Sequence, residues 1–476
     1  MTTSIPLCID LDGTLLNSDL LLEAAFAQLK QAPLAVLNWP RWLAAGKARL
    51  KAEIAERVEL DIATLPYNRE LLAFLHEQKA QGRTLVLVTA SHRQFADRVA
   101  AHLNLFDEVL ATDGDRNLAG PHKAEVLVER YGERGFDYAG NAAVDLAVWR
   151  HARRALVVNA KPPLADQARA VCEVERVFAP AGSVWRPWSR ALRLHQWLKN
   201  VLIFVPLVAG HVWNQPDTLL LALLAFLSFG LCASSVYLLN DLLDLSADRR
   251  HPRKCRRPFA AGQLPIAQGV VAIPLLLIAA FGLSLLINPP WFSAVLATYY
   301  LFTLAYSLRL KRTLMLDVVV LAGLYTLRII AGAAAAAIEP SFWLLAFSMF
   351  LFLSLALVKR YAELWTLREQ GDLNASGRGY QVNDLGLLQN LGGAAGYLAV
   401  LVLALYINSE ASHALYGQPM VIWLLCPALL YWISRVWLIT HRGEMHDDPI
   451  IFALTDVHSR YVLLACALIL LGAMPR

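Results

Sequence analysis

Charged residues are scarce in this sequence, and their scarcity is informative. Asp, Glu, Lys and Arg account for only 17% of the 476 residues, whereas hydrophobic residues account for 57%. One soluble core does not usually absorb so much apolar surface, so the composition argues against a protein that is soluble throughout and favours a membrane protein. The net charge of +5 matters less than where the positive residues lie.

Close cysteine pairs and a secretion signal are also lacking. The six cysteines are dispersed, a pattern that matches neither a zinc site nor a disulfide framework. Asp10 and Asp12 interrupt the only early apolar run, so a signal peptide is not expected. We therefore expect the N-terminal part to lie in the reducing cytosol.

The hydrophobic residues are unevenly distributed, and the change in composition marks a domain boundary. Residues 1–180 mix charged and apolar residues, whereas apolar runs of transmembrane length follow one another over residues 200–476. In the linker between them, residues 181–199, tryptophans alternate with basic residues. This mixture predicts an interfacial helix among lipid headgroups, although an ordinary basic linker is an alternative.

Hydropathy predicts an all-α membrane domain of about nine transmembrane helices. They lie near residues 200–213, 218–239, 266–287, 291–307, 314–337, 341–358, 390–408, 420–440 and 461–474. Loops on one side are long or basic, and loops on the other carry no Lys or Arg. The positive-inside rule then places the basic loops and the N-terminal domain in the cytoplasm, with the chain passing many times through the inner (plasma) membrane.

The residue pattern of the N-terminal part predicts an α/β domain with a Rossmann-like parallel sheet. Short apolar runs at residues 5–9, 84–88 and 156–158, and a weaker one at 137–139, alternate with helical patterns. Residues 18–80 are longer than a crossover between the first two strands needs. We expect them to form a small helical cap over the C-terminal edge of the sheet.

Two aspartates follow the first predicted strand. Asp10 and Asp12 precede Gly13 at the strand end, where a carboxylate and a backbone carbonyl can converge on Mg²⁺. In such a site Asp10 can attack a phosphorus atom and Asp12 can protonate the leaving oxygen. Taken alone, the pair is equally compatible with a surface turn.

Later motifs make this half resemble the haloacid dehalogenase-like superfamily. Thr89 matches the family's phosphate-binding hydroxyl, Lys123 matches its basic residue, and residues 140–145 match its final acidic motif. The resemblance implies Mg²⁺ ligands at Asp10, Asp12, Asn141 and Asp145. The family usually has aspartate where this chain has Asn141, so an active phosphatase and a regulatory or vestigial domain both remain open.

In the membrane part, three aspartates follow an apolar span. Asp241, Asp244 and Asp248 are spaced i, i+3 and i+7, which puts them on one face of a helix. Clustered like charges destabilise one another unless a cation lies among them, and Mg²⁺ bound to a diphosphate is the natural candidate. Lys254 and Arg257 follow and can hold phosphates. A solvated polar helix end is the alternative.

This stretch resembles the first signature of the UbiA-like prenyltransferase superfamily, and the resemblance covers most of residues 195–476. Members with aromatic acceptors usually carry a second pair of aspartates. Here residues 306–312 are basic and a single Asp317 follows. Arg328 lies inside an apolar span, where an unpaired charge costs several kcal/mol, so we expect it to face a polar cavity.

The basic second signature, with residues 196–201, 359–364, 378–380 and 446–449, resembles the decaprenyl-phosphate phosphoribosyltransferase branch. In that branch the donor is phosphoribosyl pyrophosphate and the acceptor is a polyprenyl phosphate, so both substrates are anions. The resemblance implies that Asp241, Asp244 and Asp248 are catalytic and bind Mg²⁺–pyrophosphate. It assigns substrate binding to Asn240, Lys254, Arg257, Tyr306, Lys311, Asp317, Arg328, Lys359 and Arg360.

The sequence therefore predicts a Mg²⁺-dependent transferase that moves 5-phosphoribose to a polyprenyl phosphate. The fused phosphatase domain would then remove the 5-phosphate from the lipid product, aided by its tethering. The alternative is a UbiA-type prenyltransferase that moves a polyprenyl chain from its diphosphate to an aromatic acceptor. A lipid-binding anchor without activity is weaker, because an anchor needs no carboxylate cluster. No nucleic-acid partner is expected.

Overall fold

The computed structural model describes residues 5–113, 117–160, 162–179, 182, 185–288, 290–370, 379–445 and 448–474. The chain forms two compact units, each made of two segments. The first unit combines Met1–Leu192 with Tyr237–Pro274, and the second combines Arg193–Val236 with Leu275–Arg476. The division near residues 180 and 199 that the composition suggests stays a prediction.

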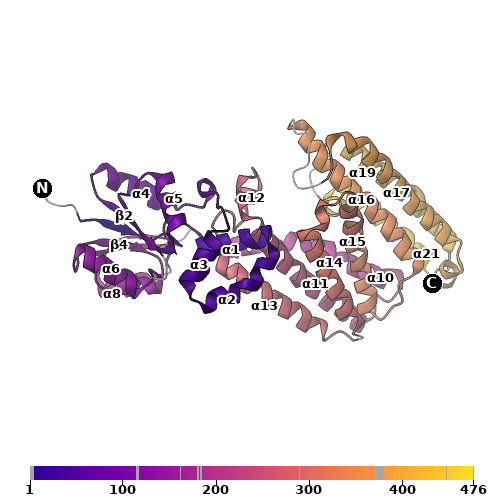
Figure 1. The fold of residues 1–476 in the computed structure, drawn as a ribbon. Coiled ribbons are helices and arrows are strands. Elements are labelled where there is room, and N and C mark those ends of the chain that lie inside the picture. Colours follow the sequence, from indigo (N-terminus) through magenta and orange to yellow (C-terminus); the bar gives the residue numbers. More distant parts are fainter. Residues whose placement is uncertain are drawn as a thin grey trace. The chain divides into compact units, whose positions relative to one another are not determined.

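A parallel sheet of six strands lies in the first unit (Figure 1). The strands are β1 (Leu7–Ile9), β2 (Leu85–His92), β3 (Glu108–Thr112), β4 (Asp137–Gly140), β5 (Arg154–Val158) and β6 (Glu173–Phe178), in the order β3-β2-β1-β4-β5-β6. The predicted α/β fold is confirmed. Strands β3 and β6, which form the two edges of the sheet, were not predicted from the sequence. An edge strand needs no continuous apolar run, and β6 alternates charged with apolar residues.

Hydrophobic clusters cover both faces of the sheet, because successive residues of a strand point to opposite faces. Leu7 and Ile9 belong to one cluster, and Cys8 between them belongs to another. Helices α4 (Arg69–Ala80) and α5 (Arg93–Leu103) contribute to the first cluster, and α6 (Pro121–Tyr131), α7 (Leu146–Trp149) and α8 (Pro162–Val171) contribute to the second. This packing holds the strand ends, and the loops that follow them, in fixed positions.

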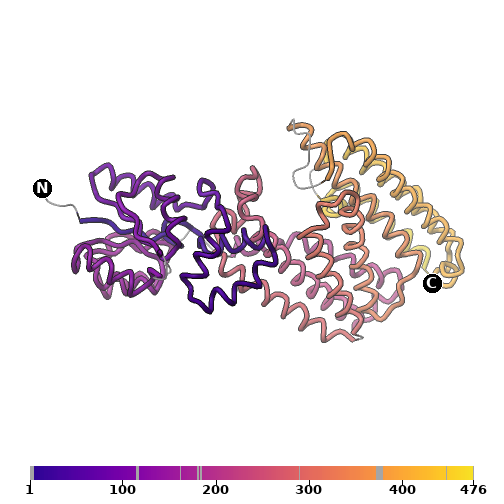
Figure 2. The backbone as a smooth tube through the Cα atoms, viewed as in Figure 1, coloured from indigo at the N-terminus to yellow at the C-terminus, as the bar shows by residue number. Residues whose placement is uncertain are grey.

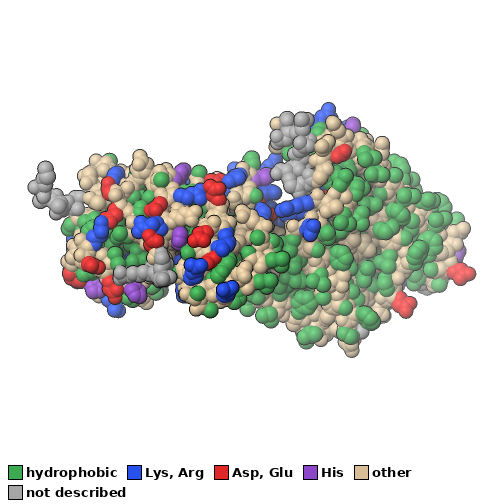
Figure 3. All heavy atoms as spheres, viewed as in Figure 1, with side chains coloured by type: hydrophobic (Ala, Val, Ile, Leu, Met, Phe, Trp, Pro, Cys, Tyr) green, Lys and Arg blue, Asp and Glu red, His purple; other side chains and the backbone are tan. Residues whose placement is uncertain are grey.

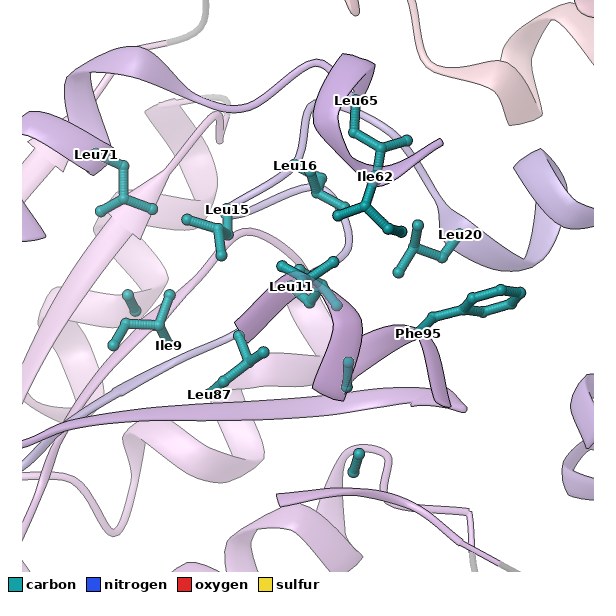
Figure 4. Packing of buried hydrophobic residues seen from close by; sticks show 14 of the residues in the cluster. Ile9, Leu11, Leu15, Leu16, Leu20, Ile62, Leu65, Leu71, Leu87 and Phe95 are labelled. Carbon is teal, nitrogen blue, oxygen red and sulfur yellow. The ribbon is translucent and has the colours of Figure 1, made fainter. Parts of the chain in front are cut away.

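A helical cap is present between β1 and α4. It consists of α1 (Leu20–Gln31), η1 (Pro33–Asn38), α2 (Trp39–Ala44), α3 (Lys47–Ala55) and η2 (Ile62–Thr64). Leu20 and Ile62 belong to the same hydrophobic cluster as Leu87 of β2 (Figure 4). Lys51 of α3 donates to the carbonyl oxygen of Ala90 (2.6 Å), near the C-terminal end of β2. The cap therefore lies over the edge of the sheet at which the strands end. Helix α4, which the predicted cap range also included, packs on the sheet instead.

The linker contains two helices where one was predicted. Helix α9 (Trp185–Ala191) ends just before Arg193, whose φ of +51° is left-handed, and η4 (Leu194–Phe204) begins after it. A left-handed residue interrupts a right-handed helix. The break falls at the boundary between the two compact units.

Long apolar helices dominate the rest of the chain. Within the described ranges, seven are long and apolar enough to cross a membrane: α11 (Pro216–Leu243), α13 (Ile266–Ser284), α14 (Trp291–Leu308), α15 (Leu316–Ala335), α16 (Phe342–Glu369), η7 (Val382–Asp384) with α17 (Leu385–Ile407), and η8 (Pro419–Leu424) with α19 (Leu425–His441). An eighth is present if α20 (Pro449–Thr455) and α21 (Val457–Ala473), bent by 78°, form one span. The chain is a multi-pass membrane protein, and the predicted nine spans are approximate.

Two of the predicted spans differ from the observed helices. The region predicted as a span at residues 200–213 contains the end of η4 and the short α10 (Val205–Ala209), and the combined apolar helix is too short to count as a span. The last span is bent because Asp456 caps α21. Its side chain accepts a hydrogen bond from the N–H of Ser459 (2.8 Å), so α20 and α21 are separate helices.

The two parts of the chain differ in surface chemistry. In the second unit, α16, α17 and α19 pack beside one another (Figure 2). Hydrophobic side chains cover the visible face of the membrane helices, whereas charged side chains gather over the N-terminal part (Figure 3). Leu285 is 80% exposed and Phe342 is 74% exposed. Such exposure is costly in water and is expected where helices face lipid.

Candidate active sites

The first site lies at the carboxyl ends of β1 and β4. Asp10 follows β1, is 8% exposed, and donates its backbone N–H to the carbonyl oxygen of Ala139 in β4 (3.0 Å). Gly13 (φ +78°) lies close to Asn141 in the loop after β4. A Cβ on Gly13 would come within 2.1 Å of the Asn141 amide nitrogen, so a side chain does not fit here. The two acidic motifs of this domain are therefore side by side.

A buried lysine joins the carboxylates of this site. Lys123 of α6 is 4% exposed, and its ammonium group donates to Asp10 Oδ1 (2.6 Å) and to the hydroxyl of Tyr138 (2.8 Å). That hydroxyl in turn donates to Asp145 Oδ1 (2.9 Å). The structure thus brings Asp10, Lys123 and Asp145 together through Tyr138. Tyr138 was not predicted from the sequence, because a tyrosine inside an apolar strand gives no polar signal.

Asn141 and Asp145 occupy different positions in the site. The hydroxyl of Thr14 lies 3.3 Å from both Asp10 Oδ2 and Asn141 Oδ1, so one hydroxyl contacts both side chains. Asp145 Oδ2 instead accepts from the backbone N–H groups of Asn141 and Ala142 (3.0 Å each) and holds the loop. The side-chain oxygens best placed for Mg²⁺ are therefore those of Asp10 and Asn141, a set that fits the ion with less charge than two carboxylates supply.

Asp12 is held by the cap and by β2. Its oxygens accept from the Ser91 hydroxyl (2.5 Å) and from the N–H of Leu20 at the start of α1 (2.8 Å). Thr89, the predicted phosphate-binding residue, is fully buried, and its hydroxyl oxygen accepts from the N–H of Ser91 (2.9 Å). Ser91 and Lys51 were missed, because nothing in their local spacing marks them as neighbours of the aspartates.

Burial dominates the electrostatics of this pair of aspartates. It raises the pKa of the Asp12 carboxyl to about 7. It also raises the pKa of Asp10, although the charge of Lys123 opposes that shift. Burial removes water that would otherwise stabilise the negative charge of each carboxylate. A cation that enters the site therefore interacts strongly with both carboxylates.

The first aspartate cluster of the membrane part is not one continuous helical face. Asp241 lies in the last turn of α11, which ends at Leu243, and Asp248 lies in α12 (Leu245–Arg250). Asp244 stands between the two helices (φ −102°, ψ 9°). The helix is interrupted there, so the prediction that all three aspartates share one helical face is wrong for Asp244. Its carboxylate instead forms an ion pair with the ammonium group of Lys30 in α1 (2.6 Å).

Asp241 and Asp248 remain neighbours, because one arginine reaches both. Nη1 of Arg257 lies 3.1 Å from Asp241 Oδ1 and 2.7 Å from Asp248 Oδ2, and both aspartates are 2% exposed. Burial raises the pKa of Asp248, and the Arg257 charge opposes this. Lys254, in the exposed η5 (Lys254–Arg256), and Asn240 of α11 flank the cluster in sequence. Across the described part of the chain, no group of three or more His, Cys, Asp or Glu side chains has the arrangement of a metal site.

A second cluster of charges lies inside the second unit. Asp448, at the start of α20, accepts from Lys199 of η4 (2.7 Å) and from Lys359 of α16 (3.1 Å). The hydroxyl of Tyr325 lies 3.3 Å from both carboxylate oxygens. Lys359 was a predicted site residue. Lys199 and Asp448 belong to motifs noted in the sequence, whereas His446 and Asp447 lie outside the described residues.

Arg328 is held in the same unit by neighbouring polar groups. It is 4% exposed and donates to Asn200 Oδ1 (3.0 Å), to the carbonyl oxygen of Leu324 (2.6 Å) and to the hydroxyl of Tyr299 (3.0 Å). Its guanidinium also lies over the rings of Tyr299 and Tyr325. Protein groups therefore supply the polar surroundings that its charge requires.

Arg360 forms a third polar group. Its Nε lies 2.9 Å from Asp317 Oδ2, and both residues are buried. The hydroxyl of Tyr380 donates to Asp317 Oδ1 (2.5 Å). Tyr306 of α14 interacts electrostatically with Arg360 and with Asp317. Lys311 lies in the short η6 (Leu310–Arg312), and Arg378 is outside the described residues.

An apolar cavity of about 860 Å³ lies within the second unit. Phe347 and Leu351 of α16, Leu425 and Trp432 of α19, and Cys466 of α21 are among the residues that line it. Its walls are mostly aliphatic and aromatic. A cavity of this chemistry can hold a hydrocarbon chain.

Family models match both parts of the chain. The model described as the UbiA prenyltransferase family matches residues 201–457, and the model described as haloacid dehalogenase-like hydrolase matches residues 7–150. These matches confirm the two family resemblances inferred from the motifs.

Individual relatives add detail. An uncharacterized protein of Sinorhizobium fredii is 37% identical over 472 residues, which cover 98% of this chain and 91% of that protein. A decaprenyl-phosphate phosphoribosyltransferase of Mycolicibacterium smegmatis is 38% identical over 207 residues, which cover 42% of this chain and 64% of that protein. The solved structure of a UbiA homologue from Archaeoglobus fulgidus bound to GPP and Mg²⁺ is similar with a TM-score of 0.47 and 17% identity, covering 60% of this chain and 99% of that one.

Proposed function

Because the chain belongs to the UbiA prenyltransferase family, we propose that its membrane part transfers 5-phosphoribose from phosphoribosyl pyrophosphate to a polyprenyl phosphate. The bond between ribose C1 and the pyrophosphate oxygen breaks, and a bond from C1 to an oxygen of the lipid phosphate forms. Pyrophosphate leaves. Donor, acceptor and leaving group are all anions, so the reaction requires cations around each of them.

The observation that carries this proposal is the convergence of two lysines on Asp448. Lys199 and Lys359 are both within 3.1 Å of that carboxylate, inside a unit made of apolar helices. Two lysines against one carboxylate leave an excess of positive charge, which suits an anionic lipid headgroup better than a neutral aromatic acceptor. The similarity to the phosphoribosyltransferase of Mycolicibacterium smegmatis supports the same assignment.

The donor would be held by the first aspartate cluster. In this proposal Asp241, Asp244 and Asp248 would hold Mg²⁺, and the ion would supply positive charge to the leaving pyrophosphate. Arg257, which bridges two of these carboxylates, would be available to a phosphate once Mg²⁺ neutralised them. The apolar cavity supports the lipid assignment, because it offers room for part of a polyprenyl chain.

For the haloacid dehalogenase-like domain we propose removal of the 5-phosphate from the lipid product. Asp10 attacks the phosphorus, the bond to the sugar oxygen breaks, and Asp12 donates a proton to that oxygen. Water then attacks the aspartyl phosphate, gives its proton to Asp12 and releases phosphate. Mg²⁺, held by Asp10, Asn141 and the backbone near Asp12, would neutralise the phosphoryl oxygens, and Asp145 supports the loop that carries Asn141.

A second candidate is transfer of a polyprenyl chain from its diphosphate to an aromatic acceptor. The first aspartate cluster and the apolar cavity favour it equally, because both serve any prenyl diphosphate. The excess of basic over acidic residues in the second signature disfavours it.

An assay of purified protein in detergent distinguishes these candidates. The protein is incubated with Mg²⁺, radiolabelled phosphoribosyl pyrophosphate and a polyprenyl phosphate, and the label in the organic phase is measured. We expect label in the lipid with the wild type and none with Asp244→Ala. Absence of label, together with transfer from a polyprenyl diphosphate to an aromatic acid, would establish the second candidate.

We also propose that the chain resides in the inner (plasma) membrane with residues 1–180 on the cytoplasmic side, on the strength of its basic loops. Protease digestion of inverted and right-side-out vesicles tests this. The N-terminal domain should be cleaved only in inverted vesicles.

A further inference from the structure

Helix α1 of the cap has polar contacts near both of its ends. At its start, the N–H of Leu20 donates to Asp12 (2.8 Å) in the phosphatase site. Near its end, the ammonium group of Lys30 lies 2.6 Å from Asp244 of the first aspartate cluster. All of these residues belong to the first compact unit. A single helix therefore connects residues of both candidate sites.

A buried ion pair fixes α1 against α12. Both Nη atoms of Arg249 contact the carboxylate of Glu23, and the two side chains are only 5% and 3% exposed. Ser18 donates to the same carboxylate, and Arg249 also donates to the carbonyl oxygen of Ala260 (3.0 Å). Removal of either partner would leave a buried charge without compensation. The ion pair between Glu23 and Arg249 therefore fixes the position of α1 relative to α12.

Further contacts lie near the ion pair between Glu23 and Arg249. Arg250 lies 2.7 Å from Asp61 of the cap. Gly262 (φ +67°) approaches the cap so closely that a Cβ would come within 2.7 Å of Asn17 and 2.9 Å of Pro66. The cap therefore packs tightly on residues 249–262, which follow the aspartate cluster in sequence.

The contact between Lys30 and Asp244 differs from the buried pair. The two side chains are 35% and 27% exposed, so water screens their attraction and the contact adds little to stability. Because the contact is weak and open to water, either side chain can exchange its partner for a ligand. If Asp244 served as a ligand of Mg²⁺, the ammonium group of Lys30 would be released from the carboxylate and could bind a phosphate oxygen nearby.

We propose that the N-terminal domain contributes Lys30 to the diphosphate site of the transferase, with α1 positioned for this by Glu23 and Arg249. This deepens the proposed function and rests on the assignment of a diphosphate donor to the first aspartate cluster. The cap then has two roles: it covers the phosphatase site and it completes the transferase site. The ligand of Lys30 is a diphosphate, whether that of phosphoribosyl pyrophosphate or of a prenyl diphosphate.

Binding of Mg²⁺–pyrophosphate to the full-length protein in detergent tests this proposal without the transfer reaction. Radiolabelled pyrophosphate is titrated against the wild type, Lys30→Gln, Lys30→Arg and Lys47→Gln. Lys47 is an exposed lysine of the same cap and serves as the matched control. Asp244→Ala identifies the part of the binding that belongs to the aspartate cluster.

We expect Lys30→Gln to weaken the Asp244-dependent binding about tenfold, because one charge-assisted hydrogen bond is lost. Lys30→Arg and Lys47→Gln should bind like the wild type, and all four proteins should melt at similar temperatures. In the transfer assay, the KM for the donor should rise with Lys30→Gln while the KM for the lipid stays unchanged. Unchanged or tighter pyrophosphate binding by Lys30→Gln overturns the proposal, as does full binding by Asp244→Ala. Failure of the transfer assay alone leaves this binding result intact and counts only against the proposed reaction.

Discussion

Asn141 sets the charge of the candidate metal site in the haloacid dehalogenase-like domain. Its amide oxygen lies near Asp10, while both oxygens of Asp145 accept hydrogen bonds from Tyr138 and from the loop. A Mg²⁺ ion would therefore meet one side-chain carboxylate and one neutral amide at close range. One carboxylate and one amide attract Mg²⁺ less strongly than two carboxylates do. The site is therefore expected to require a high Mg²⁺ concentration.

Replacement of Asn141 by aspartate should strengthen metal binding. We expect Asn141→Asp to lower the Mg²⁺ concentration for half-maximal hydrolysis of p-nitrophenyl phosphate about tenfold, because an added carboxylate attracts the ion more strongly. Asn104→Asp, the same change on the exposed end of α5, should have no effect. An unchanged Mg²⁺ dependence in Asn141→Asp would show that this side chain is not a ligand.

At the scale of helices, glycine permits close approach in the second unit. A Cβ on Gly392 of α17 would lie 2.0 Å from the ring of Trp437 in α19. Trp437 Nε1 donates to the hydroxyl of Ser354 in α16 (3.1 Å), and that hydroxyl donates to the carbonyl oxygen of Gly392 (2.7 Å). Three helices thus meet at one hydrogen-bonded contact, as small residues allow in membrane bundles.

Enlargement of this contact should destabilise the bundle. We expect Gly392→Ala to lower the free energy of unfolding by about 1–3 kcal/mol, because the indole must move and its hydrogen bond weakens. The neighbouring Gly393 has nothing within 4 Å of an added Cβ, so Gly393→Ala should be neutral or slightly stabilising. Thermal unfolding in detergent measures both variants, and equal melting temperatures would argue against close packing at Gly392.

At the scale of the whole chain, domains of two families share one polypeptide. The first compact unit is discontinuous in sequence, because Tyr237–Pro274 joins the N-terminal segment. The haloacid dehalogenase-like domain therefore packs with residues Tyr237–Pro274, in addition to its connection through the linker. For the two proposed activities, such tethering would raise the effective concentration of one site for the product of the other.

This arrangement predicts a two-step product. With radiolabelled phosphoribosyl pyrophosphate, the wild type should release a lipid-linked ribose without the 5-phosphate, whereas Asp10→Asn should accumulate the phosphorylated lipid. Ion-exchange chromatography of the organic phase separates the two by charge. Asp97→Asn, a change on the exposed face of α5, is the control and should behave like the wild type. A dephosphorylated product from Asp10→Asn would mean that the domain acts on another substrate.

The amino-acid sequence by itself determined the two-part organisation, both families and most membrane helices. Hydropathy and residue periodicity report the local environment of each segment, and motifs such as residues 10–13 carry their chemistry within a few positions. The edge strands β3 and β6 were not predicted, because they are only partly buried and lack a continuous apolar run. The span predicted at residues 200–213 corresponds to an apolar helix that is too short, because apolar composition alone does not show where a helix ends.

Only the tertiary structure decided which distant residues meet. Lys199, Lys359 and Asp448 lie far apart in the chain and converge because three helical elements pack together. The i, i+3 and i+7 spacing predicted one helical face, yet the backbone bends at Asp244 and turns that carboxylate towards Lys30. Local spacing describes a straight helix, whereas bends and contacts between segments depend on the packing of the entire unit.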